Sequence, residues 1–257
     1  MAEKSDESLT HYFLLPVFNE APNIARLHEN LENVIKNSLA KRGKIFFVFV
    51  DDGSTDETAQ LLNKLFEETD HIILGDGINH GPGYAFNIGF EWILNHSVNK
   101  EDKIITLEGD NTSSLAILDK MLKVSDAGFD LVLASVYAQG GGFDKTTFFR
   151  KLTSMMANLL LRFFFDIKVL TLSSFYRIYT VEIIEKIKEK YSAIIRESGF
   201  ISMIEILIKA IRIKASIIEV PMILYSANRK GKSKMKIFKT SLSYVRFLLK
   251  GSSKNWF

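Results

Sequence analysis

The sequence predicts an α/β fold in which a mostly parallel β-sheet carries helices on both faces. The first observation is that short apolar runs alternate with stretches of helical periodicity along the first half of the chain. The second is an unbroken apolar run at residues 45–50 that ends in the acidic turn 51–56, after which a helical pattern begins. Because parallel sheets bind ligands beyond the carboxyl ends of their strands, we expect the functional site at that edge.

The first half of the chain repeats a unit of strand, polar turn and helix. Strands are predicted at residues 12–17, 45–50, 71–74, 103–107 and 130–135, and helices at 24–34, 59–66, 85–93 and 115–124. Pro22 lies in the first turn of its helix, where a missing N–H costs nothing. Ser54 or Thr55 is the expected N-cap of the second helix, and Asp56 by itself is also better explained by capping.

The second half of the chain is less regular. We predict helices at residues 148–165, 181–191 and 199–213, a strand at 175–179 and an extended segment at 215–224. Pro221 lacks the N–H that a central strand needs, so it limits the last segment to a sheet edge or a strand end. No linker divides the chain. We therefore expect one domain over residues 1–235, with a disordered lead at 1–10, followed by a basic amphipathic tail at 236–257.

The composition is that of an ordinary folded protein of 257 residues, with 25% charged and 47% hydrophobic side chains. The absence of cysteine excludes disulfides and thiolate metal sites. The stretch closest to a membrane span, residues 155–175, carries Arg162, Asp166 and Lys168, so we expect no transmembrane helix. The polar N-terminus lacks the layout of a secretory signal.

Three of the predicted strands end in acidic residues. Glu20 follows the first strand, Asp51 and Asp52 follow the second, and Glu108 and Asp110 follow the fourth. In a parallel sheet these ends converge, and several carboxylates at one edge favour a divalent metal with a phosphate-bearing ligand. Glu108 and Asp110 project to the same side of an extended backbone, where they can clamp one Mg²⁺ or Mn²⁺.

Several motifs together match a known family. LPVFNE at 15–20, VDDGSTDET at 50–58 and NHGPGYAFNIG at 79–89 resemble family 2 glycosyltransferases, which have the GT-A (Rossmann-like) fold and use nucleotide-sugar donors. Residues 108–110 stand in the place of the family's DxD-type metal motif, and residues 150–158 look like its RxxxSxxxN element.

The C-terminal motifs indicate a branch of that family. EVP at 219–221 precedes RKGKSKM at 229–235, and this block is similar to dolichol-phosphate mannosyltransferases and other polyprenyl-phosphate glycosyltransferases. The resemblance implies inverting transfer of a sugar from a GDP- or UDP-linked donor to a lipid phosphate, whose oxygen attacks the anomeric carbon. It also implies Mg²⁺ or Mn²⁺ as the cofactor.

The resemblance assigns roles to individual residues. Donor binding falls on Pro16, Phe18, Glu20, Asp51, Asp52, Gly81 and Gly83. Asp110, with Glu108 and Thr112, would hold the metal on the donor diphosphate, where it neutralises the charge of the leaving group.

The acceptor is also an anion, so its approach to the donor requires cations. Arg150, Arg177, Arg229 and Lys234 are the expected catalytic cations, in addition to the catalytic role of Asp110. A phosphate nucleophile is already deprotonated, and it needs little general base. Glu205 matches a family acid that would face the acceptor or position the cations; the alternative is a salt bridge to Lys209, four residues further on.

Four positions depart from the family pattern. Glu108 replaces an Asp, Val136 stands where the lipid-phosphate branch often has Arg, Phe175 replaces a small residue, and Phe86 fills a position that is commonly basic. These departures leave open two alternatives. One is a family 2 transferase that acts on a saccharide or protein hydroxyl and needs a general base, and the other is a nucleotide-sugar-binding homologue without activity.

Two segments suggest contact with a membrane. Residues 155–170 are apolar around most of the helix, and they form either a buried helix or an interfacial one. The tail at 236–257 alternates basic with apolar and aromatic residues, which suits an anionic membrane surface. We expect peripheral attachment at the cytoplasmic face, with room for a membrane protein that presents the acceptor. Nucleic acid is an unfavourable partner because the acidic sheet edge would repel it.

Overall fold

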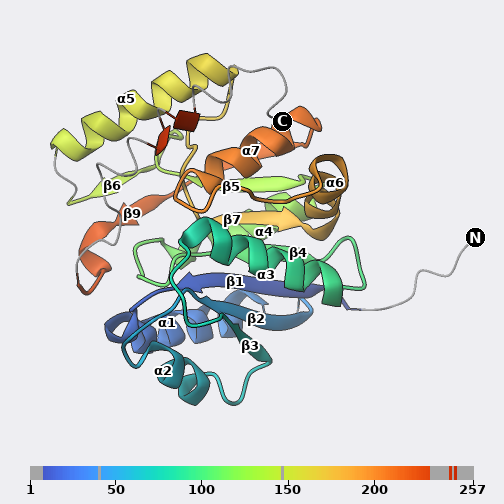
Figure 1. Cartoon of the computed structure of the whole chain (residues 1–257), viewed down its shortest axis with the longest axis vertical. Coiled ribbons are helices and arrows are strands. Elements are labelled where there is room, and N and C mark those ends of the chain that lie inside the picture. The colour runs from blue at the N-terminus through green and yellow to red at the C-terminus, as the bar shows by residue number, and fades with distance from the viewer. Residues whose placement is uncertain (1–7, 40–41, 146–147, 232–242, 245, 248–257) are drawn as a thin grey trace, which may run out of the picture.

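The computed structural model describes residues 8–39, 42–145, 148–231, 243–244 and 246–247, and its centre is a seven-stranded sheet (Figure 1). The strand order is β3-β2-β1-β4-β7-β5-β8. The strands are β1 (Thr10–Val17), β2 (Lys44–Asp51), β3 (His71–Leu74), β4 (Lys103–Thr106), β5 (Leu131–Ser135), β7 (Arg177–Thr180) and β8 (Ile217–Pro221). All neighbouring strands are parallel except β7, which is antiparallel to both β4 and β5. The predicted mostly parallel α/β fold is confirmed.

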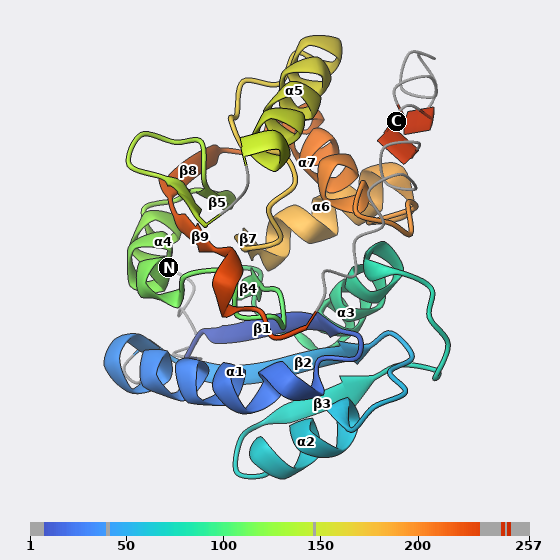
Figure 2. The same cartoon turned by 90° about the vertical axis from the view of Figure 1, so that its left-hand side faces the viewer.

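Helices cover both faces of the sheet (Figure 2). They are α1 (Ala21–Val34), α2 (Thr58–Leu65), α3 (Pro82–His96), α4 (Leu118–Asp126), α5 (Phe148–Phe165), α6 (Val181–Tyr191) and α7 (Ser202–Arg212). Helices α1, α2 and α4 pack on one face and α3, α6 and α7 on the other. Short helical turns lie at Ile35–Leu39, Leu115–Ile117 and Ser226–Asn228.

The apolar run of β2 is continuous because this strand is covered on both sides. Phe47 and Phe49 point toward α1 and α2, where both rings contact Phe66 at centroid distances of 5.0 and 4.8 Å. Val48 and Val50 point the other way into the cluster that includes α3. Successive side chains on a strand face opposite sides, so a strand buried between two helical layers is apolar at every position.

Two elements differ from the sequence prediction. The extended segment at 215–224 is two strands, because β8 ends at Pro221 and β9 (Ile223–Tyr225) pairs in parallel with the unpredicted strand β6 (Gly142–Asp144). Helix α2 begins at Thr58, so the prediction that Ser54 or Thr55 caps it is wrong. Ser54 instead accepts a hydrogen bond from the backbone N–H of Asn19 at 2.8 Å.

The ends of the chain are described only in part. Residues 1–7 of the predicted disordered lead lie outside the described residues, and Thr10 already belongs to β1. Of the predicted tail, only 243–244 and 246–247 are described. Phe247 is buried and contacts Phe165 of α5 at a centroid distance of 5.4 Å, so this aromatic side chain belongs to the core. Among the described residues, no helix combines the length and the apolar character that crossing a membrane requires.

The N-terminus of α3 packs closely against the loop that precedes α7. The N–H of Gly83 donates to the Ser198 carbonyl at 2.7 Å, and a Cβ at Gly83 would lie 2.0 Å from the Glu197 carbonyl oxygen. Only a residue without a side chain fits this contact between two backbones.

We expect Gly83→Ala to lower the free energy of unfolding by about 1–3 kcal/mol, because the backbone of the loop must move to admit the methyl group. Urea denaturation measures the change. Gly142→Ala is the matched control, since a Cβ there meets nothing within 4 Å. Equal losses in the two variants would contradict this account of the contact.

Candidate active site

The carboxyl ends of β1, β2 and β4 meet at one edge of the sheet. The N–H of Asp52 donates to the Val17 carbonyl at 2.9 Å, which joins the turn after β2 to the end of β1. Gly109, after β4, lies close to Glu20, because a Cβ added to it would be 3.6 Å from the Glu20 Cγ. The predicted convergence of three acidic strand ends is therefore present in the structure.

Asp52 accepts hydrogen bonds from the loop that leads into α3. Its carboxylate receives the N–H groups of His80 at 2.7 Å and Gly81 at 2.9 Å, and the side-chain amide of Asn79 at 3.0 Å. Burial raises the pKa of Asp52, and the two backbone donors lower it in part. Gly81 has a φ of +100°, a conformation that suits glycine and turns its N–H toward the carboxylate. Asp52 thus fixes the glycine loop at the predicted donor site.

The turns after β1 and β2 also hold each other. Asp51 accepts the Ser54 N–H at 2.9 Å, and the N–H of Glu20 donates to the hydroxyl of Thr58 at 2.8 Å. Pro16 and Phe18 are half-buried at this edge. The predicted donor residues at the ends of β1 and β2 therefore lie at one edge of the sheet, whereas Gly83 is buried against the loop before α7. Their contacts with a nucleotide remain predictions.

Asp110 is held at both of its oxygens. Oδ1 accepts the N–H of Thr112 at 3.0 Å and its hydroxyl at 2.6 Å. Oδ2 accepts both Nε of Arg229, at 2.7 Å, and Nη2 of the same guanidinium. Arg229 comes from the segment after β9, so the structure joins two residues that are 119 positions apart in the sequence.

Glu108 faces a crevice beside α1. Its Oε2 accepts the hydroxyl of Ser113 at 2.7 Å. Burial raises the pKa of the Glu108 carboxyl, and the charge of Asp110 adds to the rise. The crevice has a volume of about 320 Å³, and its lining includes Arg26 and Asn30.

The acidic edge suits a divalent metal only if other ligands complete the coordination shell. Within the described residues, no three His, Asp, Glu or Cys side chains gather closely enough to hold an ion. Magnesium, however, is commonly bound by one or two carboxylates together with substrate phosphates. Asp110 already attracts a cation, the guanidinium of Arg229, to one of its oxygens. By their chemistry, the carboxylates of Asp110 and Glu108 fit Mg²⁺ or Mn²⁺, and the hydroxyl of Thr112 fixes the other oxygen of Asp110. The metal itself remains a prediction.

The other predicted cations lie in different settings. Arg177 is fully buried and donates to the carbonyls of Leu172, Ser174 and Met203 and to the hydroxyl of Tyr179. A guanidinium satisfied in this way braces the loop before β7 against α7. The prediction that Arg177 is a catalytic cation is therefore not supported, because its buried guanidinium is already bonded to protein oxygens. The side chain of Arg150 and the whole of Lys234 lie outside the described residues.

Glu205 has the alternative role that its spacing from Lys209 suggested. Its carboxylate contacts the Lys209 ammonium at 2.6 Å, and both side chains are 1% exposed. It also accepts the backbone N–H groups of Arg196 at 3.0 Å and Glu197 at 2.8 Å. Glu205 thus fixes the loop before α7 from the protein interior.

Two of the departures from the family pattern are in direct contact. The Phe86 and Phe175 rings pack edge to face at a centroid distance of 5.1 Å, and Phe175 stacks on Phe200 at 5.5 Å. An aromatic cluster therefore replaces the basic residue and the small residue together. Val136 is half-buried and packs against the cluster beneath α1, α2 and α4.

A buried asparagine that the sequence interpretation missed links these parts. Asn23, which is 1% exposed, donates to Glu20 and exchanges two hydrogen bonds with the backbone of Lys230. The carbonyl of Asn23 also accepts the side-chain amide of Asn111 at 3.0 Å. Its position in the first turn of α1 suggested only an ordinary helix residue, because its partners are distant in sequence.

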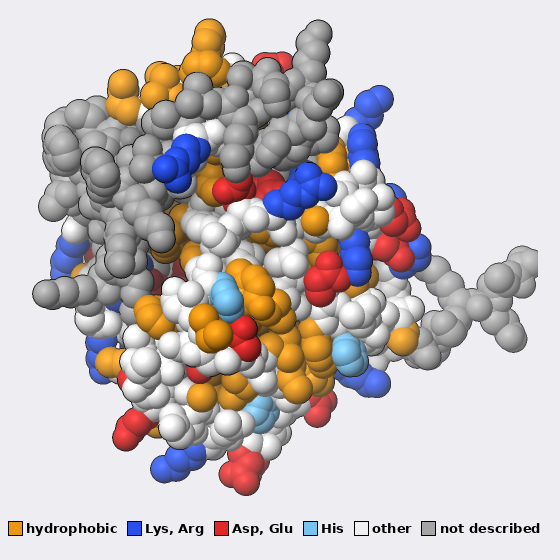
Figure 3. Space-filling view, in the orientation of Figure 1, with side chains coloured by type: hydrophobic (Ala, Val, Ile, Leu, Met, Phe, Trp, Pro, Cys, Tyr) orange, Lys and Arg blue, Asp and Glu red, His pale blue; other side chains and the backbone are white. Residues whose placement is uncertain are grey.

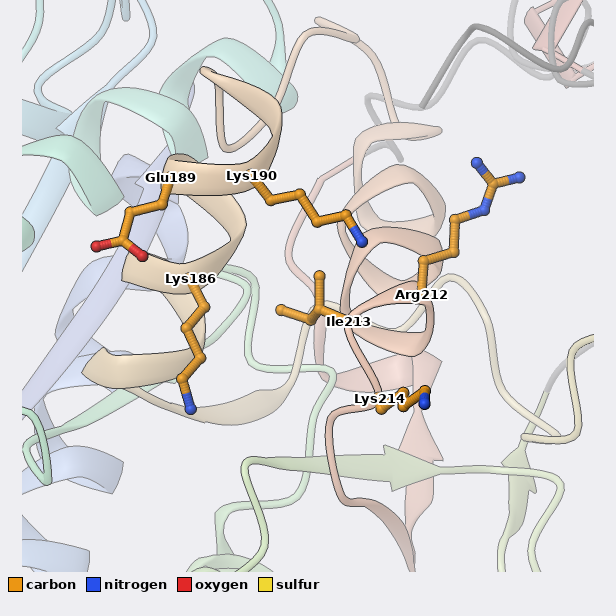
Figure 4. A pocket seen from close by; sticks show the side chains of 6 residues that line it. All are labelled: Lys186, Glu189, Lys190, Arg212, Ile213 and Lys214. Carbon is orange, nitrogen blue, oxygen red and sulfur yellow. The ribbon is translucent and has the colours of Figure 1, made fainter.

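A separate hollow lies between the C-terminal ends of α6 and α7 (Figure 4). Its volume is about 540 Å³, and its lining is Lys186, Glu189, Lys190, Arg212, Ile213 and Lys214. None of the predicted site residues lines it. Basic residues in the last turn of a helix offset the partial negative charge of its carbonyls, which accounts for Lys190 and Arg212.

Comparison with known proteins identifies the family. A model of the glycosyl transferase family 2 matches residues 12–188. The chain belongs to this family. It is an enzyme of the glycosyltransferase class, and the crowded acidic edge described above lies inside the matched region.

Two curated relatives act on lipid phosphates according to their names. Polyprenol monophosphomannose synthase of Mycolicibacterium smegmatis is 27% identical over 224 residues, which are 86% of this chain and 79% of the relative. Dolichol-phosphate mannosyltransferase of Pyrococcus furiosus is 25% identical over 239 residues, 91% of this chain but only 61% of the relative. The chain therefore spans less than two thirds of the Pyrococcus protein.

A solved structure supports the fold. The crystal structure of mannosyl-3-phosphoglycerate synthase from Rubrobacter xylanophilus superposes with a TM-score of 0.65 at 16% identity, over 96% of this chain and 76% of that chain. The match confirms the predicted GT-A type of α/β fold.

We expect Glu205→Gln to lower the free energy of unfolding by about 3–5 kcal/mol, because it leaves the buried Lys209 ammonium without its counterion. Glu182→Gln is the control, since it breaks an ion pair of the same spacing with Lys186 on the surface of α6. Its cost should not exceed about 1 kcal/mol. Chemical denaturation compares the variants, and similar losses would show that the buried pair is not a structural element.

Proposed function

We propose that this enzyme transfers a sugar from a GDP- or UDP-linked donor to a polyprenyl or dolichyl phosphate at a membrane surface, with inversion at the anomeric carbon and Mg²⁺ or Mn²⁺ as cofactor. The observation that carries the proposal is the meeting of acidic strand ends with one arginine. Asp110, Asp52 and Glu20 come from three strand ends of one edge, and Arg229 reaches the same point from the second half of the chain.

The acidic side of this edge would hold the donor. Asp51 suits the nucleoside, because a carboxylate accepts hydrogen bonds from base and ribose groups. The proposed contact of Asp52 with the nucleoside is less direct, because both of its oxygens already accept hydrogen bonds from the glycine loop. Asp110 and Glu108 suit a divalent ion, which would neutralise the charge that develops on the departing nucleoside diphosphate. Gly81 lets the backbone of the loop approach a ligand closely, and Asp52 keeps that loop in place.

The acceptor is proposed to be a lipid phosphate for two reasons. Both curated relatives are named for phosphorylated polyisoprenoid acceptors and for mannose, so mannose is the first sugar to test. Arg229 can supply a forked cation to a phosphate beside Asp110. The predicted roles of Arg150 and Lys234 as further phosphate-binding cations remain part of this proposal.

A hydroxyl acceptor is less well supported. That reaction needs a general base, and Glu205 was the family acid considered for this role. Glu205 is 1% exposed and pairs with Lys209, so it is not available to take a proton from a substrate. A phosphate acceptor needs no such group, because its oxygen is already ionised at neutral pH.

Helix α5 supports the proposed membrane contact. Six large apolar side chains on this helix are exposed: Met155, Met156, Leu159, Leu160, Phe163 and Phe164. Figure 3 shows hydrophobic side chains at the top of the molecule, where α5 lies in Figure 1. Of the two interpretations of residues 155–170, the exposed face favours the interfacial helix. Nucleotide sugars are made in the cytoplasm, which favours the cytoplasmic face of the membrane.

The direct test is transfer of label to lipid. The full chain with Mn²⁺ and radiolabelled nucleotide sugars should move label to a polyprenyl phosphate and not to the matching polyprenol, which has the same lipid without the phosphate. Asp110→Asn should reduce the rate by about 10²–10³-fold, because the charge that holds the cation is lost. Glu67→Gln, an exposed acid at the end of α2, serves as the control. Transfer to the polyprenol, or to no lipid at all, would refute the proposal.

Flotation with anionic liposomes tests the membrane contact separately. Phe163→Ser with Phe164→Ser should move the protein out of the lipid fraction, because both exposed rings are lost from the α5 face. Val98→Ser removes a similarly exposed apolar side chain from the loop between α3 and β4 and should have no effect. Unchanged flotation of the double variant would show that α5 does not contribute to membrane binding.

A further inference from the structure

The ion pair between Arg229 and Asp110 occupies the position that a metal would need. Oδ1 of Asp110 already accepts two hydrogen bonds from Thr112, at 3.0 and 2.6 Å. The remaining oxygen, Oδ2, receives both nitrogens of the Arg229 fork. Asp110 is 7% exposed, so few water molecules can share this oxygen. A divalent ion can reach Asp110 only if it displaces the guanidinium from Oδ2.

Hydrogen bonds fix the segment that carries Arg229 on both sides of this residue. Before Arg229, the N–H of Tyr225 donates to the Thr112 carbonyl at 2.9 Å. After it, Lys230 donates its N–H to Oδ1 of Asn23 at 2.9 Å, and its carbonyl accepts Nδ2 of Asn23 at 3.1 Å. These bonds join uncharged groups and do not depend on the charge of Arg229. We call residues 225–230 the latch segment.

We propose that the latch segment is a cation-exchange device, in which Arg229 holds Asp110 until a divalent ion takes the carboxylate and frees the guanidinium for an anionic oxygen. The inference rests on the proposed function, because it uses the same metal site and a phosphate-bearing ligand. It adds that binding of the ion and release of Arg229 are a single exchange.

The electrostatics favour such an exchange. Two cations on one carboxylate oxygen repel each other, and the repulsion is stronger than in bulk water because the Asp110 side chain is only 9% exposed. The guanidinium must therefore move when the ion binds, while the bonds to Asn23 and Thr112 keep its backbone nearby. Arg229 then lies within a side chain's reach of any phosphate that accompanies the ion. Because linkage is reciprocal, an anion that binds Arg229 must also strengthen binding of the ion.

The exchange can be tested without donor or lipid. The free Mn²⁺ signal in electron paramagnetic resonance gives the Kd of the full chain, and we expect Arg229→Met to lower this Kd by at least about fivefold. Asp110→Asn should abolish the binding in both backgrounds, which locates the ion. Lys230→Met is the matched control, since it removes an exposed cation at the next position.

Lys230→Met should change the Kd far less than Arg229→Met does. The proposal falls if Arg229→Met leaves Mn²⁺ binding unchanged or weaker, if Lys230→Met has the same effect, or if neither the native chain nor the variant binds Mn²⁺. A failed transfer to lipid phosphate would leave these results intact, so the two proposals can fail separately.

A second measurement follows the guanidinium itself. The Nε–H of Arg229 donates to Asp110 at 2.7 Å, so its ¹⁵N–¹H signal should exchange slowly with solvent. Loss of the signal in Arg229→Met assigns it. Titration with Mg²⁺, which is diamagnetic, should speed the exchange and shift the signal. A signal that stays unchanged while Mg²⁺ binds would contradict the proposal that the ion displaces Arg229 from Asp110.

Discussion

The arrangement of the loops around the site depends on the repulsion between carboxylates that meet at one edge of the sheet. Strands β1, β2 and β4 deliver carboxylates to one edge, where they would repel one another if nothing compensated them. Three of these acids each accept hydrogen bonds from a different donor. Backbone N–H groups hold Asp52, the amide of Asn23 holds Glu20, and a guanidinium from the far end of the chain holds Asp110. The loops around the site are arranged by the donors that these acids require.

The sequence was informative where burial alone decides the structure. The unbroken apolar run of β2 predicted a strand covered on both faces, and the acidic turns after three strands predicted a shared edge. These features follow from local periodicity and from the geometry of parallel sheets. The family resemblance then assigned the residues, and the matched model confirms the family.

The sequence could not show which charged side chains are buried. Arg177 and Arg229 are both arginines in family motifs, but one braces a loop through backbone carbonyls and the other reaches a carboxylate 119 positions away. Asn23 was missed for the same reason, since its partners, Asn111 and Lys230, are distant in sequence. Glu205 differs from these residues because its partner, Lys209, is only four residues away in the sequence. The salt bridge expected from that spacing is present in the structure.

The position of β7 has a consequence for how the molecule assembles. This strand follows β5 in the chain but lies between β4 and β5, antiparallel to both. During synthesis, the strands that carry the acidic edge are made long before β4 acquires its second neighbour. Until β7 emerges, β4 is an open sheet edge with unpaired N–H and C=O groups, which is prone to mispairing. Strands β1 to β4 therefore lack a neighbour on the β4 side until β7 is made, and pairing between strands far apart in sequence is expected to make folding slow.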